Sequence, residues 1–514
     1  MSGDPEIERL LDRWLAEGLD EVPDRAIDRA LGIVERTPQR RRALGWRPHV
    51  ALRAPARLAL AAAAVLILVG AGAALVAFRG TTTLVGGTVA PPPNGHDDTV
   101  ALQTALDACV PGGEGCTVRL SAGTYLTKQL AANGFHGTIV GAGEDRTTIQ
   151  ALPGYVVGKD VWTGPASASN PYPYVLTFGG ASDVTVSDLS LRVTESNPVP
   201  KGRPNEVPKG WYNTYMAYPW GNLGATTTGP HVTWLDGVVR VEGAAWFSRV
   251  SFEGASGPDG GLNTPGVPGV NVDSAVVVDQ ATAPAGVFEM TACRTRNVGS
   301  AFTLAHFRGR ATIGGSPAAG NTFTNSGGGQ FFDLDGATVL ESYDQIHADA
   351  TSAGYFGAFF WKDHAANAPS TVLLAHNRIV AAGILFGGID VEYAAPRDTM
   401  LHLTVTANEI VVAGAGTPRS TGLGNWAIHA AYTSGIVISN NTISGMGYEA
   451  ISLANSADST ISGNILSGFT PTGSRARIAL DAWTTGARVT CAGPSDTVVN
   501  DGTGNTVTGC LVSK

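Results

Sequence analysis

Short stretches of alternating apolar and polar residues recur along the chain after residue 96, which is the pattern of half-buried β-strands. Two clear copies begin at Val437 (VISNNTISG) and Thr460 (TISGNILSG), and their asparagines, Asn441 and Asn464, are 23 residues apart. Asn377 (in AHNRI) and Asn408 (in ANEIV) precede them, each lying between stretches of apolar strand residues. Repeats of about 20 to 50 residues are typical of solenoids. The pattern therefore predicts stacked coils in which each Asn turns inward and bonds the backbone of the next coil.

A helix and several strands are expected where these coils begin. Asp97 and Asp98 precede an apolar face of Val100, Leu102 and Leu106, which is typical of a capped helix. An alternating strand follows from residue 117, and residues 137–149 read as a strand, a glycine turn and a second strand. A solenoid needs its first coil covered, so we expect this helix to cap it.

These segments together resemble a known family. The run DDTVALQTALDAC…TVRLSAGTYL…GTIVGAGEDRTTI resembles the opening of pectate-lyase-like right-handed parallel β-helix proteins, closely over residues 96–150 and more loosely to the C-terminus. The resemblance implies an all-β, right-handed parallel β-helix over residues 96–514 with an N-terminal capping helix. That fold carries lyases, hydrolases, epimerases, esterases and adhesins, so it does not define the chemistry. The chain lacks the Gly-His-Gly and Arg-Ile-Lys motifs of the polygalacturonase branch.

An uncharged apolar stretch lies near the N-terminus, at residues 58–78. As a helix it would extend roughly 30 Å, which matches the hydrocarbon core of a bilayer. Seven arginines lie between residues 36 and 57, whereas Arg79 is followed by no basic residue before Arg119. Since an arginine excess marks the cytoplasmic side, we expect a single-pass cell-membrane protein. Its parts would be a cytoplasmic helical segment at 1–57, a transmembrane helix at 58–78, a Pro/Gly/Thr linker at 79–95 and an extracellular domain.

The charge of the chain argues against nucleic acid as a partner, and its cysteines suggest disulfides. The chain carries a net charge of −9, and the part beyond residue 79 is the acidic part. An acidic domain is a poor nucleic-acid binder, because neutralising phosphates supplies most of that affinity. An extracellular location permits disulfides, so we predict Cys109–Cys116 and Cys491–Cys510, with Cys293 left alone and buried. Five unpaired thiols are the alternative.

Aligning the coils on the strands after each Asn turn predicts a candidate site. The expected inward stack consists of Phe332, Phe360, Ile428 and Ile451. The outward residues that follow them are Asp333, Trp361, His429 and Ser452. Asp335 and Asp363 lie two residues further along, so Asp333, Asp335 and Asp363 would form a crowded carboxylate patch. Crowding raises the pKa of one carboxyl and places an acid beside a base, as glycosidic cleavage requires.

Other interpretations of this patch remain open. It can equally hold Ca²⁺, although no cofactor is required, or consist of solvated aspartates on the outer face. Asp390 and Glu392 form a second acidic pair with the same ambiguity. His306, His364 and His429 are candidates for moving a proton, and His429 is grouped with the catalytic aspartates.

An aromatic stretch between residues 192 and 234 suggests a substrate platform, because aromatic faces stack on sugar rings. The expected contacts are Trp211, Tyr215 and Trp220, together with Trp361 of the outward row. A self-packed loop is the alternative. The sequence therefore predicts a surface-anchored protein that acts on or binds polysaccharide, as a glycoside hydrolase, lyase or epimerase. A non-catalytic adhesion or sensor module is the rival hypothesis, and the sequence does not indicate the oligomeric state.

Overall fold

The computed structural model of the chain describes residues 87–109, 115–152, 174–193, 233–254, 270–281, 283–298, 300–325, 329–348, 357–362, 368–381, 387–393, 399–412, 426–472 and 476–513. They belong to one compact unit, Thr83–Lys514. The predicted cytoplasmic segment and transmembrane helix, residues 1–78, lie outside the described residues. Within the described ranges, no helix is both long and apolar enough to cross a membrane.

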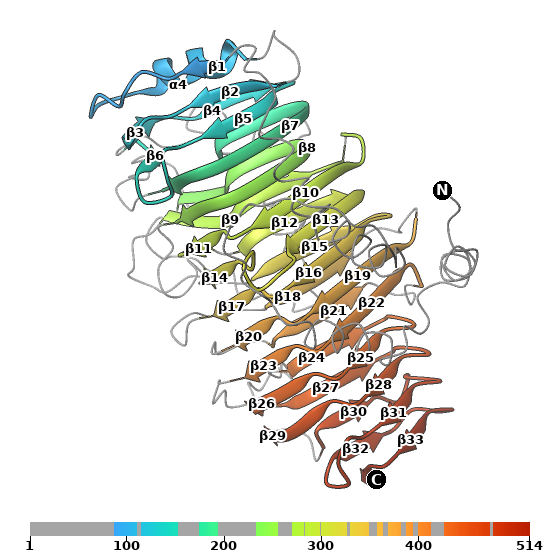
Figure 1. Ribbon diagram of the computed structural model, residues 1–514. Coiled ribbons are helices and arrows are strands. Elements are labelled where there is room, and N and C mark those ends of the chain that lie inside the picture. The colour runs from blue at the N-terminus through green and yellow to red at the C-terminus, as the bar shows by residue number, and fades with distance from the viewer. Residues whose placement is uncertain are drawn as a thin grey trace, which may run out of the picture. The chain divides into compact units, whose positions relative to one another are not determined.

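The described chain is a parallel β-helix, as predicted. Neighbouring strands are joined by parallel pairings, and in the middle coils each strand pairs with the one three places further along, as in β10–β13–β16–β19. Each coil thus contributes one strand to each of three parallel sheets that run along the solenoid. Figure 1 shows these coils following one another from α4 to the coil of β32 and β33.

The bounds of the elements are as follows. The N-terminal helix is α4 (Thr99–Asp107). Two long strands, β7 (Tyr174–Arg192) and β8 (Thr233–Glu253), turn through all three sheets. The first sheet also contains β1 (Gly87–Val89), β2 (Cys116–Arg119), β5 (His136–Val140), β10 (Gly286–Thr291), β13 (Gly309–Gly314), β16 (Thr338–Ser342), β19 (Ser370–Ala375), β22 (Leu401–Thr406), β25 (Val437–Ser439), β28 (Thr460–Ser462), β31 (Arg488–Thr490) and β33 (Thr506–Thr508).

The other two sheets run beside it. The second contains β3 (Gly123–Thr127), β6 (Thr147–Ala151), β11 (Arg294–Arg296), β14 (Thr322–Asn325), β17 (Gln345–Ala348), β20 (Arg378–Ala381), β23 (Glu409–Val412), β26 (Thr442–Gly447) and β29 (Ile465–Pro471). The third contains β4 (Leu130–Asn133), β9 (Val270–Asp279), β12 (Ser300–Phe307), β15 (Gln330–Leu334), β18 (Ala358–Lys362), β21 (Ile389–Tyr393), β24 (Trp426–Ala431), β27 (Glu449–Ala454), β30 (Ile478–Leu480), β32 (Thr497–Asn500) and β34 (Leu511–Ser513).

Helix α4 covers the first coil, as the sequence predicted. Its Leu102 and Leu106 are buried, but Val100, expected on the same face, is 77% exposed. Gln103 completes the cover, because its amide donates to the carbonyl of Ala131 at 2.7 Å and accepts the N–H of Ala131 at 3.1 Å. The open edge of β4 therefore receives the hydrogen bonds that a further strand would have supplied.

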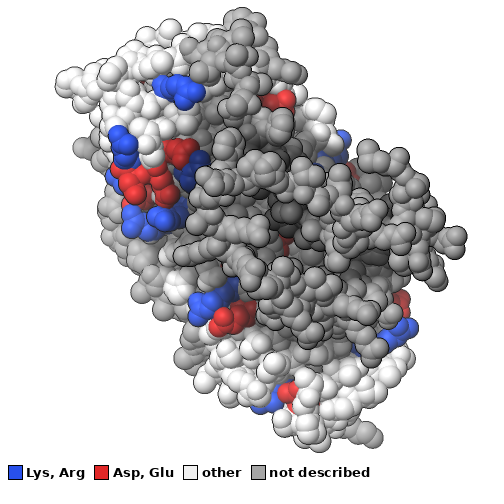
Figure 2. Space-filling view, in the orientation of Figure 1, with Lys and Arg blue, Asp and Glu red and all other residues white. Residues whose placement is uncertain are grey.

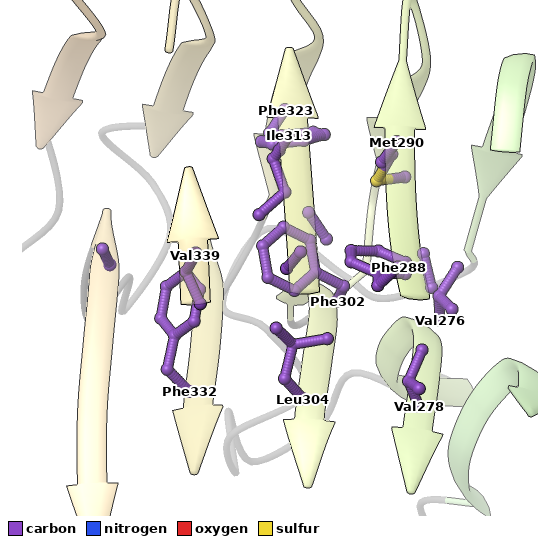
Figure 3. Close-up of a cluster of buried hydrophobic side chains, with 14 of the residues drawn as sticks. Val276, Val278, Phe288, Met290, Phe302, Leu304, Ile313, Phe323, Phe332 and Val339 are labelled. Carbon is purple, nitrogen blue, oxygen red and sulfur yellow. The ribbon is translucent and has the colours of Figure 1, made fainter. Parts of the chain in front are cut away.

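Aromatic side chains fill the interior of the middle coils. Phe288, Phe302, Phe332 and Phe360 are fully buried, and successive ring centroids lie 5.3, 5.4 and 4.5 Å apart. Figure 3 shows the first three among Val, Leu, Ile and Met side chains that come from different sheets. Burying such rings is the largest favourable contribution to folding at this level of the solenoid.

A ladder of side chains fixes the register of the coils. The predicted members Asn377, Asn408, Asn441 and Asn464 are confirmed: each Oδ1 from Asn408 onward accepts the backbone N–H of the preceding member at 2.9–3.0 Å. The ladder also continues toward the N-terminus through three residues that the sequence did not identify, Asp344, Asn321 and Cys293. In the described residues, seven successive coils are therefore connected in one register.

The turn before the ladder requires an unusual backbone conformation. Tyr343, His376, Ala407 and Asn440 each precede a ladder residue and have φ between 54° and 65°. Side-chain-bearing residues seldom adopt this left-handed region, at a cost of roughly 1 kcal/mol. The ladder bonds offset that cost, since the left-handed residue is what turns the following side chain into the interior.

We expect Asn441→Ala to lower the free energy of unfolding by about 3 kcal/mol. The substitution removes the donor to the Val405 carbonyl and leaves the buried backbone N–H of Asn408 without its acceptor. Chemical denaturation measures the change, and Thr442→Ala, at an exposed position of the next strand, is the control. Equal stabilities of the two variants would contradict a structural role for the ladder.

The cysteines are arranged as predicted. Cys109–Cys116 and Cys491–Cys510 are disulfides, and Cys293 is a buried free thiol within the ladder. Disulfides are typical of proteins in an oxidising compartment. Burial raises the pKa of the Cys293 thiol to about 12, which suppresses its reactive thiolate.

A thiol count tests this arrangement. The native, unreduced protein should not react with a hydrophilic maleimide, and the denatured, unreduced protein should bind one equivalent, at Cys293. Mass spectrometry of the labelled chain identifies the site. Three or more reactive thiols after denaturation without reductant would show that the disulfides are absent.

Candidate functional site

A β-bulge in β12 sets His306 apart from its neighbours. The register of β12 against β15 shifts between Leu304 and Phe307, and His306 lies in the shift with φ of 49°. Bulges redirect side chains and are common beside active sites. The carboxylate of Asp333 holds the bulge, because its Oδ2 accepts the backbone N–H of His306 at 3.0 Å. The side chain of His306 is 42% exposed on the outside of the solenoid.

The His306 ring faces two carboxylates. Its Nδ1 lies 3.6 Å from Asp279 Oδ1 and 3.9 Å from Asp333 Oδ2. Asp279 is in turn held by Arg240, whose Nη2 lies 3.0 Å from Asp279 Oδ2 and 3.0 Å from Glu242 Oε1. We call these five residues the His306 network. Nδ1 is shielded from solvent, so the exposure of the side chain falls on its other atoms.

Electrostatics keep Asp279 ionised. Burial acts to raise the pKa of Asp279, but the facing His306 ring, the hydrogen bond from the N–H of Ala281 and the charge of Arg240 outweigh it, so the pKa lies below its usual value. An ionised Asp279 favours a proton on the facing Nδ1 of His306, which leaves Nε2 as the acceptor. This is the arrangement in which an imidazole takes up a proton while a carboxylate stabilises the resulting cation.

The predicted aspartates do not share one set of contacts. Asp333 binds the preceding coil through His306, whereas Asp335 Oδ1 accepts the N–H of Ala368 in the following coil at 3.2 Å. Asp363 lies outside the described residues, so the three-carboxylate patch stays a prediction. No three His, Cys, Asp or Glu side chains in the described ranges are placed to hold a metal ion, and calcium binding likewise stays a prediction.

The expected register of the outward row is wrong between β18 and β24. Phe332 pairs with Phe360 and Ile428 with Ile451, as predicted, but Phe360 is in register with Val391, which pairs with Ala430. The four side chains therefore do not form one stack. The reason is that the coils differ in length, and alignment on sequence alone placed Ile428 instead of Ala430 in the row of Phe360.

His429 consequently lies in a different row from Asp333. It is in register with Asp390 of β21 and Ser452 of β27. Its ring stacks on Trp426 with centroids 4.3 Å apart, and Trp426 Nε1 donates to Glu449 Oε2 at 3.2 Å. Burial of the ring lowers the pKa of His429 to about 4, and the charge of Asp481 opposes this only in part. His429 is therefore neutral at physiological pH.

Aromatic contacts are only partly described. Trp211, Tyr215 and Trp220 lie outside the described residues, and Trp361 is placed on β18 without a described side chain. Phe331, which the sequence did not single out, lies half-buried on an outward position of β15. On this strand it precedes Asp333 by two residues, so both point to the same side of the third sheet.

Sequence reasoning also missed most of the His306 network. His306 was one of three candidate histidines, but Arg240, Glu242 and Asp279 lie at strand positions without a motif. The bulge that turns His306 outward contains no glycine or proline, the residues that usually indicate a bulge in a sequence. The useful signal would have been three charged residues at the ends of strands that stack in one sheet.

Charged residues of the second sheet neutralise each other instead of forming a site. Arg192 and Arg296 both contact Glu253, at 2.8 and 2.5 Å, and Arg249 forms a two-pronged pair with Asp188. Figure 2 shows acidic and basic side chains of the described surface lying side by side in such mixed groups. Surface pairs of this kind are worth little individually, and they leave few free charges to attract a polyion.

Comparisons with known proteins assign neither a family nor a function to the chain. No family model and no curated protein matches the chain. Among solved structures, the mannuronan C-5 epimerase AlgE6 A-module of Azotobacter vinelandii is 14% identical, covering 81% of this chain and 96% of its own, with a TM-score of 0.36. PfbA, a surface adhesin of Streptococcus pneumoniae, is 13% identical over 82% and 91%, with a TM-score of 0.38. A Yersinia enterocolitica family 28 exopolygalacturonase is 10% identical over 80% and 78%, with a TM-score of 0.36. At this level of similarity no function is assigned.

The low pKa of His429 predicts a specific loss of stability in acid. Between its ordinary value of 6.5 and about 4, the unfolded chain binds a proton that the folded chain does not bind. The contribution of His429 to stability is therefore lost as the pH is lowered. The loss is about 1.4 kcal/mol per pH unit in this window. Denaturation at pH 7, 6 and 5 should show that His429→Gln gains stability relative to the wild type as the pH is lowered. His347→Gln, at an exposed position, should match the wild type; a matching His429→Gln would disprove the assignment.

Proposed function

We propose that this chain is an extracytoplasmic β-helix protein that acts on a carbohydrate polymer bound along the outer face of the third sheet, with His306 as the acid–base group. The observation that carries the proposal is the geometry of His306. Its Nδ1 faces two carboxylates, its ring is partly open to solvent, and its backbone is held by Asp333 in a conformation of low intrinsic stability. Such constraints are concentrated at functional sites.

The network favours proton abstraction over hydrolysis. A glycoside hydrolase needs two accessible carboxyl groups on either side of the scissile bond. Here Asp279 and Asp333 lie behind the imidazole, with side chains only 18% and 9% exposed. In this proposal Nε2 of His306 is the group that meets a substrate. Removal of a carbon-bound proton, as in elimination or epimerisation of a uronic acid residue, is the reaction class that fits this arrangement.

Each member of the network has a role in such a reaction. His306 takes the substrate proton on Nε2, and the ionised Asp279 stabilises the imidazolium that forms. Arg240 keeps Asp279 ionised and in place, while Asp333 fixes the position of the ring through the backbone. The half-buried ring of Phe331 provides an apolar surface on the same side of the sheet, suited to stacking against a sugar ring.

The full chain should be incubated with uronate-containing and neutral polysaccharides, with and without calcium. Absorbance of unsaturated products reports elimination, new reducing ends report cleavage, and deuterium uptake from heavy water reports epimerisation. We expect deuterium uptake or absorbance with at least one uronate polymer. His306→Gln should lower kcat by at least about 100-fold, the usual contribution of an acid–base group.

His402→Gln, at an exposed position of β22, is the matched control and should keep full activity. Reducing ends without absorbance would indicate a hydrolase and a different site. Binding of a polymer without turnover, unaffected by His306→Gln, would overturn the proposal in favour of a non-catalytic adhesion module.

A further inference from the structure

Four asparagines of the ladder make a donor bond that an ionised aspartate in their place could not make. The Nδ2 groups of Asn321, Asn408, Asn441 and Asn464 each donate to a backbone carbonyl of the preceding coil at 2.9 Å. At the equivalent place in its coil stands Asp344. An ionised carboxylate has no hydrogen to donate, so this coil lacks the bond that Asn321 makes in the preceding coil. In the following coil, Asn377 donates instead to Glu341 Oε1.

The contacts of Asp344 use only one of its oxygens. Oδ1 accepts the backbone N–H of Asn321 at 2.7 Å and the Nδ2 of Asn321 at 3.0 Å. Oδ2 is fully buried and has no hydrogen-bond partner. A buried acceptor without a partner is costly, whereas a protonated Oδ2 would take the position of an asparagine Nδ2 and restore the missing donor.

A second carboxyl group lies beside it in the interior. Glu341 occupies an inward position of β16, in register with Ile313 and Leu374, and is 1% exposed. Its Oε1 accepts the Nδ2 of Asn377 at 3.2 Å, and its Oε2 has no partner. Gln330 lies against Glu341 inside the solenoid, but neither of its amide atoms makes a hydrogen bond of good geometry. Three polar side chains of one coil are therefore incompletely satisfied.

Two buried carboxylates this close cannot both remain charged. Burial raises the pKa of Asp344 to about 7, although the bonds from Asn321 oppose this. Burial and the charge of Asp344 raise the pKa of Glu341 well above its usual value.

We propose that Glu341 and Asp344 retain a proton between them and form a pH-dependent latch inside the solenoid. In the latched form the proton lies on Asp344 Oδ2 and replaces the donor that asparagine supplies elsewhere in the ladder. When the pH rises the proton leaves to solvent, two buried charges face each other, and the coil of residues 330–348 loosens. The latch is independent of the proposed function, although Asp333 of the His306 network belongs to the same coil.

Most titratable groups of the described strands around the pair lie on the outside of the solenoid. In the described strands packed around the pair, Arg310, His347 and Arg378 are exposed on the outer surface. Tyr343, beside Asp344 in the turn, stacks on His376 outside the solenoid. The interior neighbour that can titrate is Cys293, whose pKa of about 12 keeps it neutral.

The latch predicts a decline of stability toward neutral pH. Between the ordinary aspartate value of 3.8 and about 7, the unfolded chain releases a proton that the folded chain keeps. The unfolding constant should therefore rise about tenfold per pH unit in this window, beyond the changes due to other groups. Chemical denaturation of the full chain at about pH 4.5, 5.5, 6.5 and 7.5 measures how the free energy of unfolding depends on pH. The slope of the wild type is then compared with the slopes of the variants.

Three variants isolate the pair. Asp344→Asn restores the ladder residue, so it should unfold at higher temperature than the wild type at neutral pH and show a smaller pH-dependent decline. Adding Glu341→Gln should flatten the profile further toward alkaline pH. Asn408→Asp, which places a carboxylate at the ladder position two coils further along, should add a decline of the same sign.

The infrared absorption of protonated carboxyl groups gives an independent readout. A band that disappears between pH 5 and 9 in the wild type, and is absent in the double variant, would support a retained proton. If Asp344→Asn lowers the unfolding temperature at neutral pH and keeps the wild-type slope, the proposal is overturned. It is overturned equally if calcium or magnesium stabilises the wild type but not the double variant, because the pair would then bind a cation.

Discussion

The register between coils is the constraint on which the rest of this solenoid depends. Parallel strands slide easily along one another when their inward faces are uniformly apolar, and a slip of one residue would turn every inward side chain outward. The ladder from Cys293 to Asn464 prevents this, because each step joins a backbone N–H to a side chain at one fixed position. The Phe288–Phe360 stack can then pack in a single arrangement.

A fixed register also allows an irregular element to be placed with precision. The bulge at His306 interrupts β12 between coils whose alignment is held elsewhere, so the interruption redirects one side chain without disturbing its neighbours. Asp279 and Asp333 reach that side chain from strands on either side of β12. The same register places two carboxyl groups inside the following coil, where Asp344 stands in a ladder of asparagines. The regular frame thus supports both an exposed charged network and a buried one.

Local repetition made the architecture predictable from the sequence. The N-x-I pattern at Asn377, Asn408 and Asn441 predicted the ladder, because those residue types recur with a spacing that coils impose. The outward row was not predictable in the same way, since unequal loops shifted Val391 and Ala430 into the row where Ile428 was expected. His306 depends on a bulge that leaves no mark in the residue pattern, and Asp344 was overlooked because aspartate replaces the repeated asparagine.

The central claim, that ligand meets the protein at His306, is tested most directly by chemical footprinting with diethyl pyrocarbonate and mass spectrometry. In the absence of polysaccharide, His306 should be modified readily, because its ring is partly exposed, and the buried His429 should be spared. A polysaccharide substrate should slow the modification of His306 selectively, and activity should fall in proportion to that modification. Protection of other surface residues with no change at His306 would show that the ligand binds elsewhere on the solenoid.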